Sequence, residues 1–479
     1  MIKSPGKYTV LIACMWLALP CFRGFAQQVP DYKNPALPVT TRVHDLLGRM
    51  TPEEKFFQLF MIPGDLDIGR EKLKTGIFGF SLPAKGAVAD AAGQAVPAGG
   101  AVHARQMAEK VNDVQKFFME ESRLQIPIIQ FDEALHGLIR EGATAFPQSI
   151  ALAATFNTDL MQQVAKAIAA ESRSRGIRQI LSPVLNIARD VRWGRTEETY
   201  GEDPFLVSQM GSAFIREFEK AGIIATPKHF AVNVGDGGRD SYPIHLSEQI
   251  MEELYFPAFK MAVQRASARS VMTAYNSFNG SPCSANNWLL NTKLKQEWGF
   301  RGFVISDACA VGGANVLHYT AAGYAEAGKQ AIENGLDVIF QTDYSHAPLF
   351  YEPFLTGAVR PGAVDSAVSR VLRAKFELGL FDNPYVDPPQ ADSINGAPAH
   401  RTLALQAARE SIVLLKNDRN LLPVHTGVRS IAVIGTDATE ARLGGYSGSG
   451  NNKISILEGI RNILPTSTTI SFSAGCGRK

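Results

Sequence analysis

The sequence predicts an α/β fold: a (β/α)8 TIM-like barrel followed by the beginning of a second α/β unit. Short apolar runs alternate with amphipathic segments in units of roughly 30 to 50 residues, which is typical of parallel strands joined by right-handed helical crossovers. Seven or eight such units over about 350 residues fit a closed barrel. No reversal of strand order and no phosphate fingerprint favours an open, doubly wound sheet instead.

The composition is that of an ordinary globular protein. The 479 residues are 45% hydrophobic and 20% charged, and their net charge is +2. No basic run is combined with interleaved aromatic residues, so nucleic acid is not an expected partner. The low charge and high apolar content also argue against a disordered chain.

The N-terminal segment has the features of a secretory signal. Lys3 and Lys7 precede an apolar run over 8–19, and Gly24 and Ala26 supply small residues before a cleavage point. We therefore expect residues 1–26 to be a signal peptide and the protein to be exported, to the periplasm or the exterior. The run is too short for a permanent membrane anchor, so no membrane association is expected after cleavage.

The barrel is expected to occupy residues 35–381. Helices are predicted at 41–59 with a fresh start at Thr51, and at 103–122, 160–175, 204–221, 247–266, 289–298, 325–334 and 363–378. Strands are predicted at 76–80, 126–131, 180–182, 225–230, 270–275, 303–306 and 337–340. The stretch 84–101, rich in Ala and Gly, is expected to be a surface loop.

A segment dense in Pro, Asp, Asn and Ala, residues 382–400, is predicted to be a linker that ends the barrel. Beyond it, over 401–479, we expect a helix at 401–416, a buried strand at 430–435, a helix at 454–464 and a strand at 468–473. A single strand–helix unit cannot cover a sheet on both faces. The second domain is therefore expected to be incomplete at Lys479.

Polar side chains follow the predicted barrel strands, and in a barrel the carboxyl ends of the strands meet on one face. Asp307 follows the apolar run Phe303 to Ile305; in isolation it is equally well explained as a helix cap. The other members of this polar group are Glu133, His136, Arg195, Lys228, His229 and Tyr275. Acidic, basic and aromatic side chains in this mixture suit a polyhydroxylated ligand such as a sugar.

Cofactors and metals are not expected. The barrel lacks paired His or Cys residues at metal-binding spacing and a Gly-rich loop that leads into a helix. The strand before Gly435 resembles the start of a dinucleotide-binding unit, but the G-x-G-x-x-G spacing is missing. An NAD-dependent enzyme stays open as an alternative that rests on this strand alone.

Several motifs, taken together, resemble glycoside hydrolase family 3, the β-glucosidase and β-xylosidase family, over residues 35 to 479. These motifs are Glu133 to Gly137, Arg189 to Pro204, Lys228-His229-Phe230 and Val304 to Asp307. Residues Gln406 to Pro423 resemble the start of the second domain of that family, an α/β/α sandwich. The motif Arg189 to Pro204 is long and specific, and the shorter ones occur in the order that the family has.

The resemblance implies a retaining, exo-acting β-glycosidase that hydrolyses β-glucosides or β-xylosides in carbohydrate catabolism. Its substrate would be an oligosaccharide or an aryl or alkyl β-glycoside. Asp307 matches the nucleophile, which forms a covalent glycosyl-Asp intermediate. The substrate-binding positions are matched by Glu133, Arg195, Lys228, His229, Met272 and Tyr275. Arg195 and Lys228 are expected to help keep Asp307 ionised.

The chain departs from the family pattern at two places. Ala308 follows the nucleophile where an aromatic residue is usual, and no segment matches the second-domain glutamate that acts as acid/base, which is expected beyond Lys479. His245 is an imperfect substitute. A second hypothesis is therefore a catalytically impaired chain that binds sugar without turning it over. Glu133, where many glucosidases of the family carry Asp, favours a pentose or a mixed specificity, because its longer side chain leaves less room at C5. The sequence leaves linkage and oligomeric state open.

Overall fold

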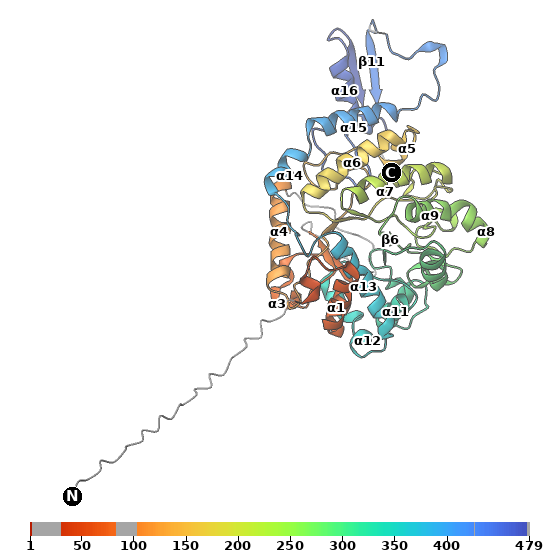
Figure 1. Cartoon of the computed structure of the whole chain (residues 1–479). Coiled ribbons are helices and arrows are strands. Elements are labelled where there is room, and N and C mark those ends of the chain that lie inside the picture. Colours follow the sequence, from red (N-terminus) through yellow and green to blue (C-terminus); the bar gives the residue numbers. More distant parts are fainter. Residues whose placement is uncertain (2–29, 83–102, 426, 477–479) are drawn as a thin grey trace.

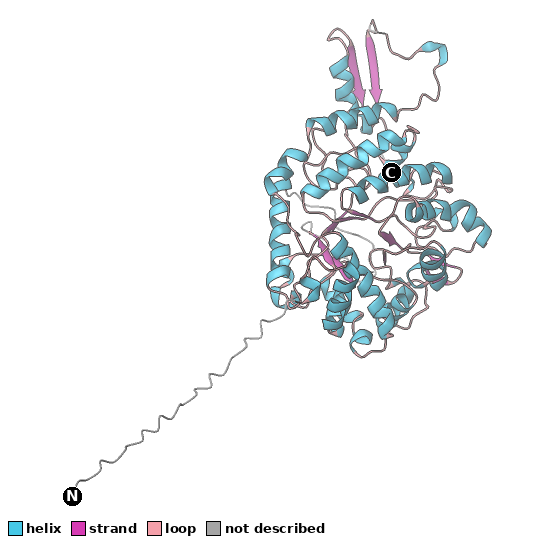
Figure 2. Cartoon of the chain, in the orientation of Figure 1, coloured by secondary structure: helices cyan, strands magenta, loops and turns pink. Residues whose placement is uncertain are grey.

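The computed structural model describes residues 1, 30–82, 103–425 and 427–476 (Figure 1). The predicted signal segment, except for Met1, and the whole of the predicted loop at 84–101 lie outside the described residues. The described part contains a helical ring around a small central sheet, and a second unit beyond helix α15 (Pro398–Glu410) (Figure 2).

Within the described residues, eight short parallel strands form the barrel. They are β1 (Phe60–Pro63), β2 (Gly79–Ser81), β3 (Phe131–Asp132), β4 (Gln179–Ile180), β5 (Ile224–Ala225), β6 (Ser270–Met272), β9 (Phe303–Ile305) and β10 (Ile339–Phe340). Sheet pairing follows the orders β10-β1-β2, β3-β4-β5 and β6-β9. The three groups are joined by a hydrogen bond from Ile129 N–H to Phe78 O and by bridges Phe230–Thr273 and Ile305–Val338. The ring of strands is therefore closed, which confirms the predicted barrel class.

The helices surround this sheet. They are α1 (Val39–Arg49), α2 (Pro52–Gln58), α3 (Arg70–Leu73), α4 (Ala104–Glu120), α5 (Ser149–Ala153), α6 (Thr158–Ser174), α7 (Pro204–Lys220), α8 (Glu248–Ile250), α9 (Phe256–Gln264), α10 (Gly313–Val316), α11 (Tyr324–Glu333), α12 (Glu352–Leu355) and α13 (Pro361–Glu377). Residues Met251–Tyr255 and Trp288–Glu297 form π-helices, and β7 (Ser277–Phe278) pairs antiparallel with β8 (Ser281–Pro282). Short 3₁₀ turns lie at 31–33, 66–68, 196–198, 236–238, 283–285, 344–349, 418–420 and 436–438.

Local sequence explains where the main helices begin. Thr51 and Glu54 form a reciprocal capping box at the start of α2, and Pro52 occupies its first turn. Asp203 caps α7 by accepting hydrogen bonds from two backbone N–H groups, with Pro204 at the first position. The apolar faces of these helices close on a continuous core that includes Phe56, which is completely buried.

Strand β1 is the main element that the sequence prediction missed. The expected helix at 41–59 is confirmed as two helices, α1 and α2, but the chain then turns directly into Phe60–Pro63, which lies between β10 and β2. Because these four apolar residues follow a helix without a turn signal, their sequence is read as a continuation of that helix. Burial on both faces, which a parallel strand requires, removes the alternation that would have identified it.

The expected linker 382–400 contains helix α14 (Pro388–Ile394), which packs on α4 and α6 through the fully buried Ala391. The helix predicted at 401–416 is instead α15, which ends at Glu410. Helix α15 packs on α5 and α6, so this segment adheres to the barrel rather than separating from it.

The second unit contains β11 (Ser430–Ile434), helix α16 (Ile456–Ile463) and β12 (Thr469–Ser473), and the two strands pair in parallel. The expected strand and helix are confirmed, but the expectation that the strand is buried is wrong. Val433 is its one buried residue, because α16 covers one face of the pair and leaves the other uncovered within the described residues. In Figure 1 this unit projects beyond α15.

Among the described residues, no helix is both long and apolar enough to cross a bilayer.

Candidate active site

Asp307 lies two residues beyond the last residue of strand β9, at the end of the barrel where the polar strand-end residues gather. Its Oδ1 accepts a hydrogen bond from the Ala308 N–H at 2.8 Å, and the residue is 7% exposed. The next helix, α10, begins at Gly313 and has Gly312 at its N-cap. The alternative that Asp307 serves only as a helix cap is therefore wrong.

Glu133 and Lys228 form a buried ion pair between two strand ends. Glu133 follows β3 and Lys228 lies three residues beyond β5. Lys228 Nζ donates to Glu133 Oε1 at 2.8 Å and to Oε2 at 3.0 Å, with both residues buried. Burial raises the pKa of Glu133 to about 7, against the opposing effect of the Lys228 ammonium.

His229 is fixed between three neighbours. Its Nδ1 lies 2.9 Å from Asn186 Oδ1, its Nε2 lies 3.1 Å from Arg195 Nη2, and the same Nε2 lies 3.5 Å from Asp307 Oδ2. Burial lowers the pKa of His229 well below its usual value, and the charges of Arg195 and Lys228 lower it further. The ring is therefore neutral near pH 7, with its proton on Nδ1.

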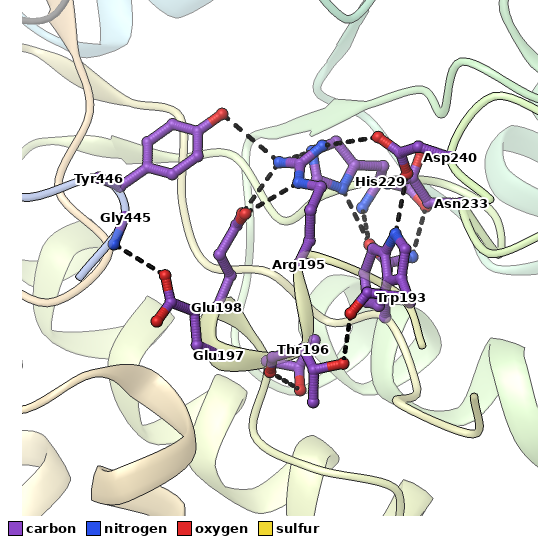
Figure 3. A network of polar contacts seen from close by, with 12 residues as sticks. Trp193, Arg195, Thr196, Glu197, Glu198, His229, Asn233, Asp240, Gly445 and Tyr446 are labelled. Carbon is purple, nitrogen blue, oxygen red and sulfur yellow. Dashed lines mark hydrogen bonds and ion pairs between the residues drawn. The ribbon is translucent and has the colours of Figure 1, made fainter. Parts of the chain in front are cut away.

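Arg195 connects the group to two further carboxylates (Figure 3). Its Nε and Nη2 donate to the two oxygens of Glu198, each at 2.9 Å, in a bidentate pair. Its Nη1 lies 3.6 Å from Asp240 Oδ2, and Asp240 Oδ1 accepts hydrogen bonds from Trp193 Nε1 and Asn233 Nδ2, each at 3.0 Å. The guanidinium plane is thus held from two sides.

The remaining predicted residues, Met272 and Tyr275, lie beside the Asp307 strand. Met272 is the register partner of Ile305 and is buried. Tyr275 is buried, and its hydroxyl is among the groups that lower the pKa of the Asp307 carboxyl. All seven site residues predicted from the sequence therefore lie on or beyond strand ends at this face of the barrel.

The electrostatic balance at Asp307 differs from the expectation. Burial is the largest influence and raises the pKa of the carboxyl above its usual value. Arg195 and Lys228 lower it, as the sequence predicted, and so do the Ala308 N–H and the Tyr275 hydroxyl. The two cations therefore oppose an upward shift but do not reverse it.

The sequence prediction assigned no role to Tyr446, Asp240 or Asn186, although all three contact the group. Tyr446 comes from the second unit, and its hydroxyl accepts from Arg195 Nη2 at 3.4 Å (Figure 3). Its ring centroid lies 4.8 Å from Lys228 Nζ. The one available signal was the Gly-rich run Leu443 to Gly450, which predicts a loop of close backbone approach.

His245, the imperfect substitute for an acid, lies elsewhere. It is exposed and lines a surface pocket with Arg189, Asp190 and Arg192, and the same pocket includes Tyr255. Asp307 does not line that pocket. This position gives His245 no support as the proton donor for chemistry at Asp307.

Chemically, the group combines one carboxylate that faces a neutral imidazole with a shell of charged donors and acceptors. Glu133 and Glu198 are engaged by Lys228 and Arg195. Within the described residues, we find no group of three or more His, Cys, Asp or Glu side chains placed to hold a metal ion. Such a shell can orient many hydroxyl groups of one ligand against the Asp307 carboxylate.

Two models of one protein family match this chain. The family model described as "Glycosyl hydrolase family 3 N terminal domain" matches residues 53–374, and the one for the C-terminal domain of the same family matches residues 412–474. A β-xylosidase of Formosa agariphila is 36% identical over 77% of this chain and 55% of its own length. A periplasmic β-glucosidase of Salmonella typhimurium is 32% identical over 90% of this chain and 55% of its own length.

Among solved structures, a β-glucosidase from Erythrobacter marinus is 32% identical, with a TM-score of 0.83 over 94% of this chain and 60% of that one. The chain thus spans a little over half the length of the curated relatives named above. Its barrel and the described part of its second unit both match one family, and the chain belongs to glycosyl hydrolase family 3.

Proposed function

We propose that this protein is a retaining, exo-acting β-glycosidase that hydrolyses β-glucosides or β-xylosides, with Asp307 as its nucleophile. The observation that carries the proposal is the position of the Asp307 carboxylate. It lies at the carboxyl end of β9, faces His229 Nε2 at 3.5 Å and is enclosed by charged donors. The names of the relatives, β-xylosidase and β-glucosidase, support the class of substrate.

In the proposed first step, an Asp307 oxygen attacks the anomeric carbon of the sugar. The bond from that carbon to the leaving oxygen breaks, and the leaving oxygen takes up a proton from solvent water, since no described residue is assigned as the acid. Water then attacks the same carbon and gives up a proton to the solvent, which releases the sugar and restores the carboxylate. Glu133, Arg195, Lys228 and His229 would hold the ring hydroxyls, with Met272 and Tyr275 lining the same subsite, because each lies within the group around Asp307.

The proposal is tested with a fluorinated glycoside that traps the covalent intermediate. Peptide mass analysis should find the label on Asp307, and Asp307→Asn should lose about a thousandfold or more in kcat while it keeps the wild-type unfolding temperature. Asp365→Asn is the control, because Asp365 is a carboxylate on α13 that pairs with Lys55, away from the polar group around Asp307. A label on another residue would overturn the assignment.

A second candidate is a chain that binds sugar without turning it over. The observation in its favour is that two carboxylates near Asp307 are engaged in ion pairs, Glu133 with Lys228 and Glu198 with Arg195. Neither is therefore placed as a free acid that could protonate the leaving group. An aryl glycoside with a good leaving group needs little protonation, so it separates the two candidates. Binding of glucose or xylose without any release of the aryl group would favour this second candidate.

We also propose that the protein is exported to the periplasm or the exterior after cleavage behind Ala26. The support is the signal-like segment in the sequence, together with a relative named periplasmic β-glucosidase. N-terminal sequencing of the protein recovered from the periplasmic fraction of its producing cells would test this; a mature N-terminus other than Gln27 would contradict the cleavage site.

A further inference from the structure

Tyr446 enters the site from the second unit, on the loop that runs from β11 to α16. Besides the contact with Lys228, its ring centroid lies 5.9 Å from Arg195 Cζ, a distance at which an aromatic face attracts a cation. Its hydroxyl is surrounded by the charges of the barrel site: burial raises the pKa of Tyr446 well above its usual value, and Glu133 adds to that shift. The aromatic ring therefore lies inside the charged group.

Two side chains of the barrel tie the backbone beside Tyr446 in place. Gln148 Nε2 donates to the Gly445 carbonyl at 2.8 Å and to the Leu443 carbonyl at 3.0 Å. Glu197 Oε1 accepts from the Gly445 N–H at 2.8 Å. The residue before Tyr446 thus has both its backbone groups bound by barrel side chains.

His136 holds the other side of the turn. Its Nδ1 lies 2.7 Å from the Phe146 carbonyl oxygen, which fixes the ring in the barrel. Its Nε2 lies 3.0 Å from Ser447 Oγ and 3.2 Å from the Gly445 carbonyl oxygen. His136 is buried and was predicted from the sequence as part of the polar group, yet the partners of its Nε2 belong to the loop.

The glycines around Tyr446 make this close approach feasible. A Cβ at Gly444 would lie 2.1 Å from Gln148 Nε2, and its φ of +86° already disfavours a side chain. A Cβ at Gly445 would lie 2.9 Å from Glu197 Oε1, and one at Gly448 would lie 3.1 Å from the Arg140 backbone nitrogen. The loop is therefore seated on the barrel by backbone contact at three places.

We propose that His136, Gln148 and Glu197 are positioning residues that hold the turn Leu443 to Gly448 on the barrel, so that Tyr446 forms a wall of the sugar pocket and determines how tightly the glycon binds. This inference rests on the proposed function, because the ligand of Tyr446 is taken to be the same sugar. We call the hydrogen-bonded turn and its three barrel partners the latch.

The physical basis is the cost of ordering. A free loop would lose backbone freedom whenever substrate requires Tyr446 in place, and that loss would reduce affinity. The latch fixes the ring in advance, because its hydrogen bonds are made between groups of the protein alone. Loosening the latch should therefore raise KM more than it lowers kcat.

The experiment measures steady-state kinetics of the full chain on 4-nitrophenyl β-xyloside and β-glucoside, with unfolding temperatures as a check. Tyr446→Ala should raise KM about tenfold and change kcat less than threefold. Gln148→Leu and Gly444→Ala should raise KM about fivefold, because they release the turn but keep the ring. The matched controls are Tyr385→Ala and Gln163→Leu on exposed surfaces, and Gly357→Ala, which has a φ of +75° and open space around its Cβ.

A double-mutant cycle separates positioning from general damage. If Gln148 acts through Tyr446, adding Gln148→Leu to Tyr446→Ala should leave KM unchanged relative to Tyr446→Ala alone. Fully additive effects would overturn the latch, and so would a KM in Tyr446→Ala equal to that of the wild type. Calorimetric Kd values for xylose and glucose should change in parallel with KM.

The outcomes distinguish this inference from the proposed function. A wild type that neither binds the two sugars nor cleaves the aryl glycosides overturns the function, and the inference with it. An active wild type whose latch variants match their controls overturns the inference alone. A wild type that binds but does not cleave still tests the latch through the calorimetric Kd.

Discussion

His229 Nε2 lies 3.5 Å from Asp307 Oδ2, and the two groups do not form an ion pair. Asn186 explains why: its Nδ2 donates to the His229 and Val232 carbonyls, so its Oδ1 must accept from the His229 ring Nδ1. Nε2 then carries the lone pair, which accepts from Arg195 Nη2 at 3.1 Å. The nucleophile candidate is thus faced by a neutral ring of fixed tautomer.

The first prediction follows from this tautomer. Asn186→Ala should lower kcat/KM about tenfold or more, because a ring protonated on Nε2 would lose the Arg195 bond and donate to Asp307. Steady-state kinetics and the unfolding temperature measure the effect. Asn287→Ala, at an exposed position, is the control and should leave both unchanged. An Asn186→Ala enzyme with wild-type kinetics would refute the tautomer argument.

The second prediction concerns stability and the pKa of Glu133, which is about 7 in the fold against an ordinary value of 4.5. A raised folded pKa means that its stability contribution is complete below pH 4.5 and is lost as pH rises to about 7. Relative to Glu133→Gln, the wild type should therefore lose up to about 3 kcal/mol of unfolding free energy over this window.

Urea unfolding at half-unit pH steps from 4 to 8 measures the unfolding free energies of both proteins. The prediction concerns how the difference between these free energies changes with pH, not its absolute size. Glu109→Gln, on the exposed face of α4, is the control and should follow the wild type. If the wild type instead gained stability relative to Glu133→Gln as pH rises, Lys228 and not burial would determine the ionisation of Glu133.

The third prediction concerns the acidic limb of activity. In the proposed mechanism Asp307 must be ionised to attack; burial raises its pKa, while Arg195 is the largest opposing influence. Arg195→Gln should therefore move the acidic limb of kcat/KM to higher pH, whereas Arg195→Lys, which keeps the charge, should leave it near the wild-type position. Equal limbs in both variants would show that another group controls this limb.

The barrel could be predicted from the sequence because its units repeat the same local pattern. The run Phe303 to Ile305, for example, is continuously apolar and is followed by Asp307, which places a carboxylate at a strand end. Strand β1 escaped because Phe60–Pro63 follows α2 without a turn signal. The uncovered strand β11 was misjudged because apolar sequence indicates a buried strand whether or not its cover is present in the described residues.

The part of the candidate site that lies at the ends of barrel strands could be predicted from the sequence. Lys228 and His229 follow β5, and the rule that strand ends meet on one face brings them to Asp307. Tyr446 could not be found this way, because it reaches Arg195 from 251 positions along the chain. Asn186 and Asp240 lie in loops whose sequence has no periodicity, so only the folded backbone shows what they bind.

The last prediction concerns the choice of sugar. The Glu133 carboxylate is fixed by two hydrogen bonds from Lys228, so its side chain cannot withdraw to make room for a larger glycon. Glu133→Asp shortens the side chain by one methylene, and a methylene in a specificity pocket is worth about tenfold or more in discrimination. The ratio of kcat/KM for aryl β-glucoside over aryl β-xyloside should therefore rise about tenfold. Glu198→Asp, which shortens the carboxylate on Arg195, is the control and should lower both values equally. An unchanged ratio in Glu133→Asp would show that this carboxylate does not decide between hexose and pentose, because the added space would have gone unused.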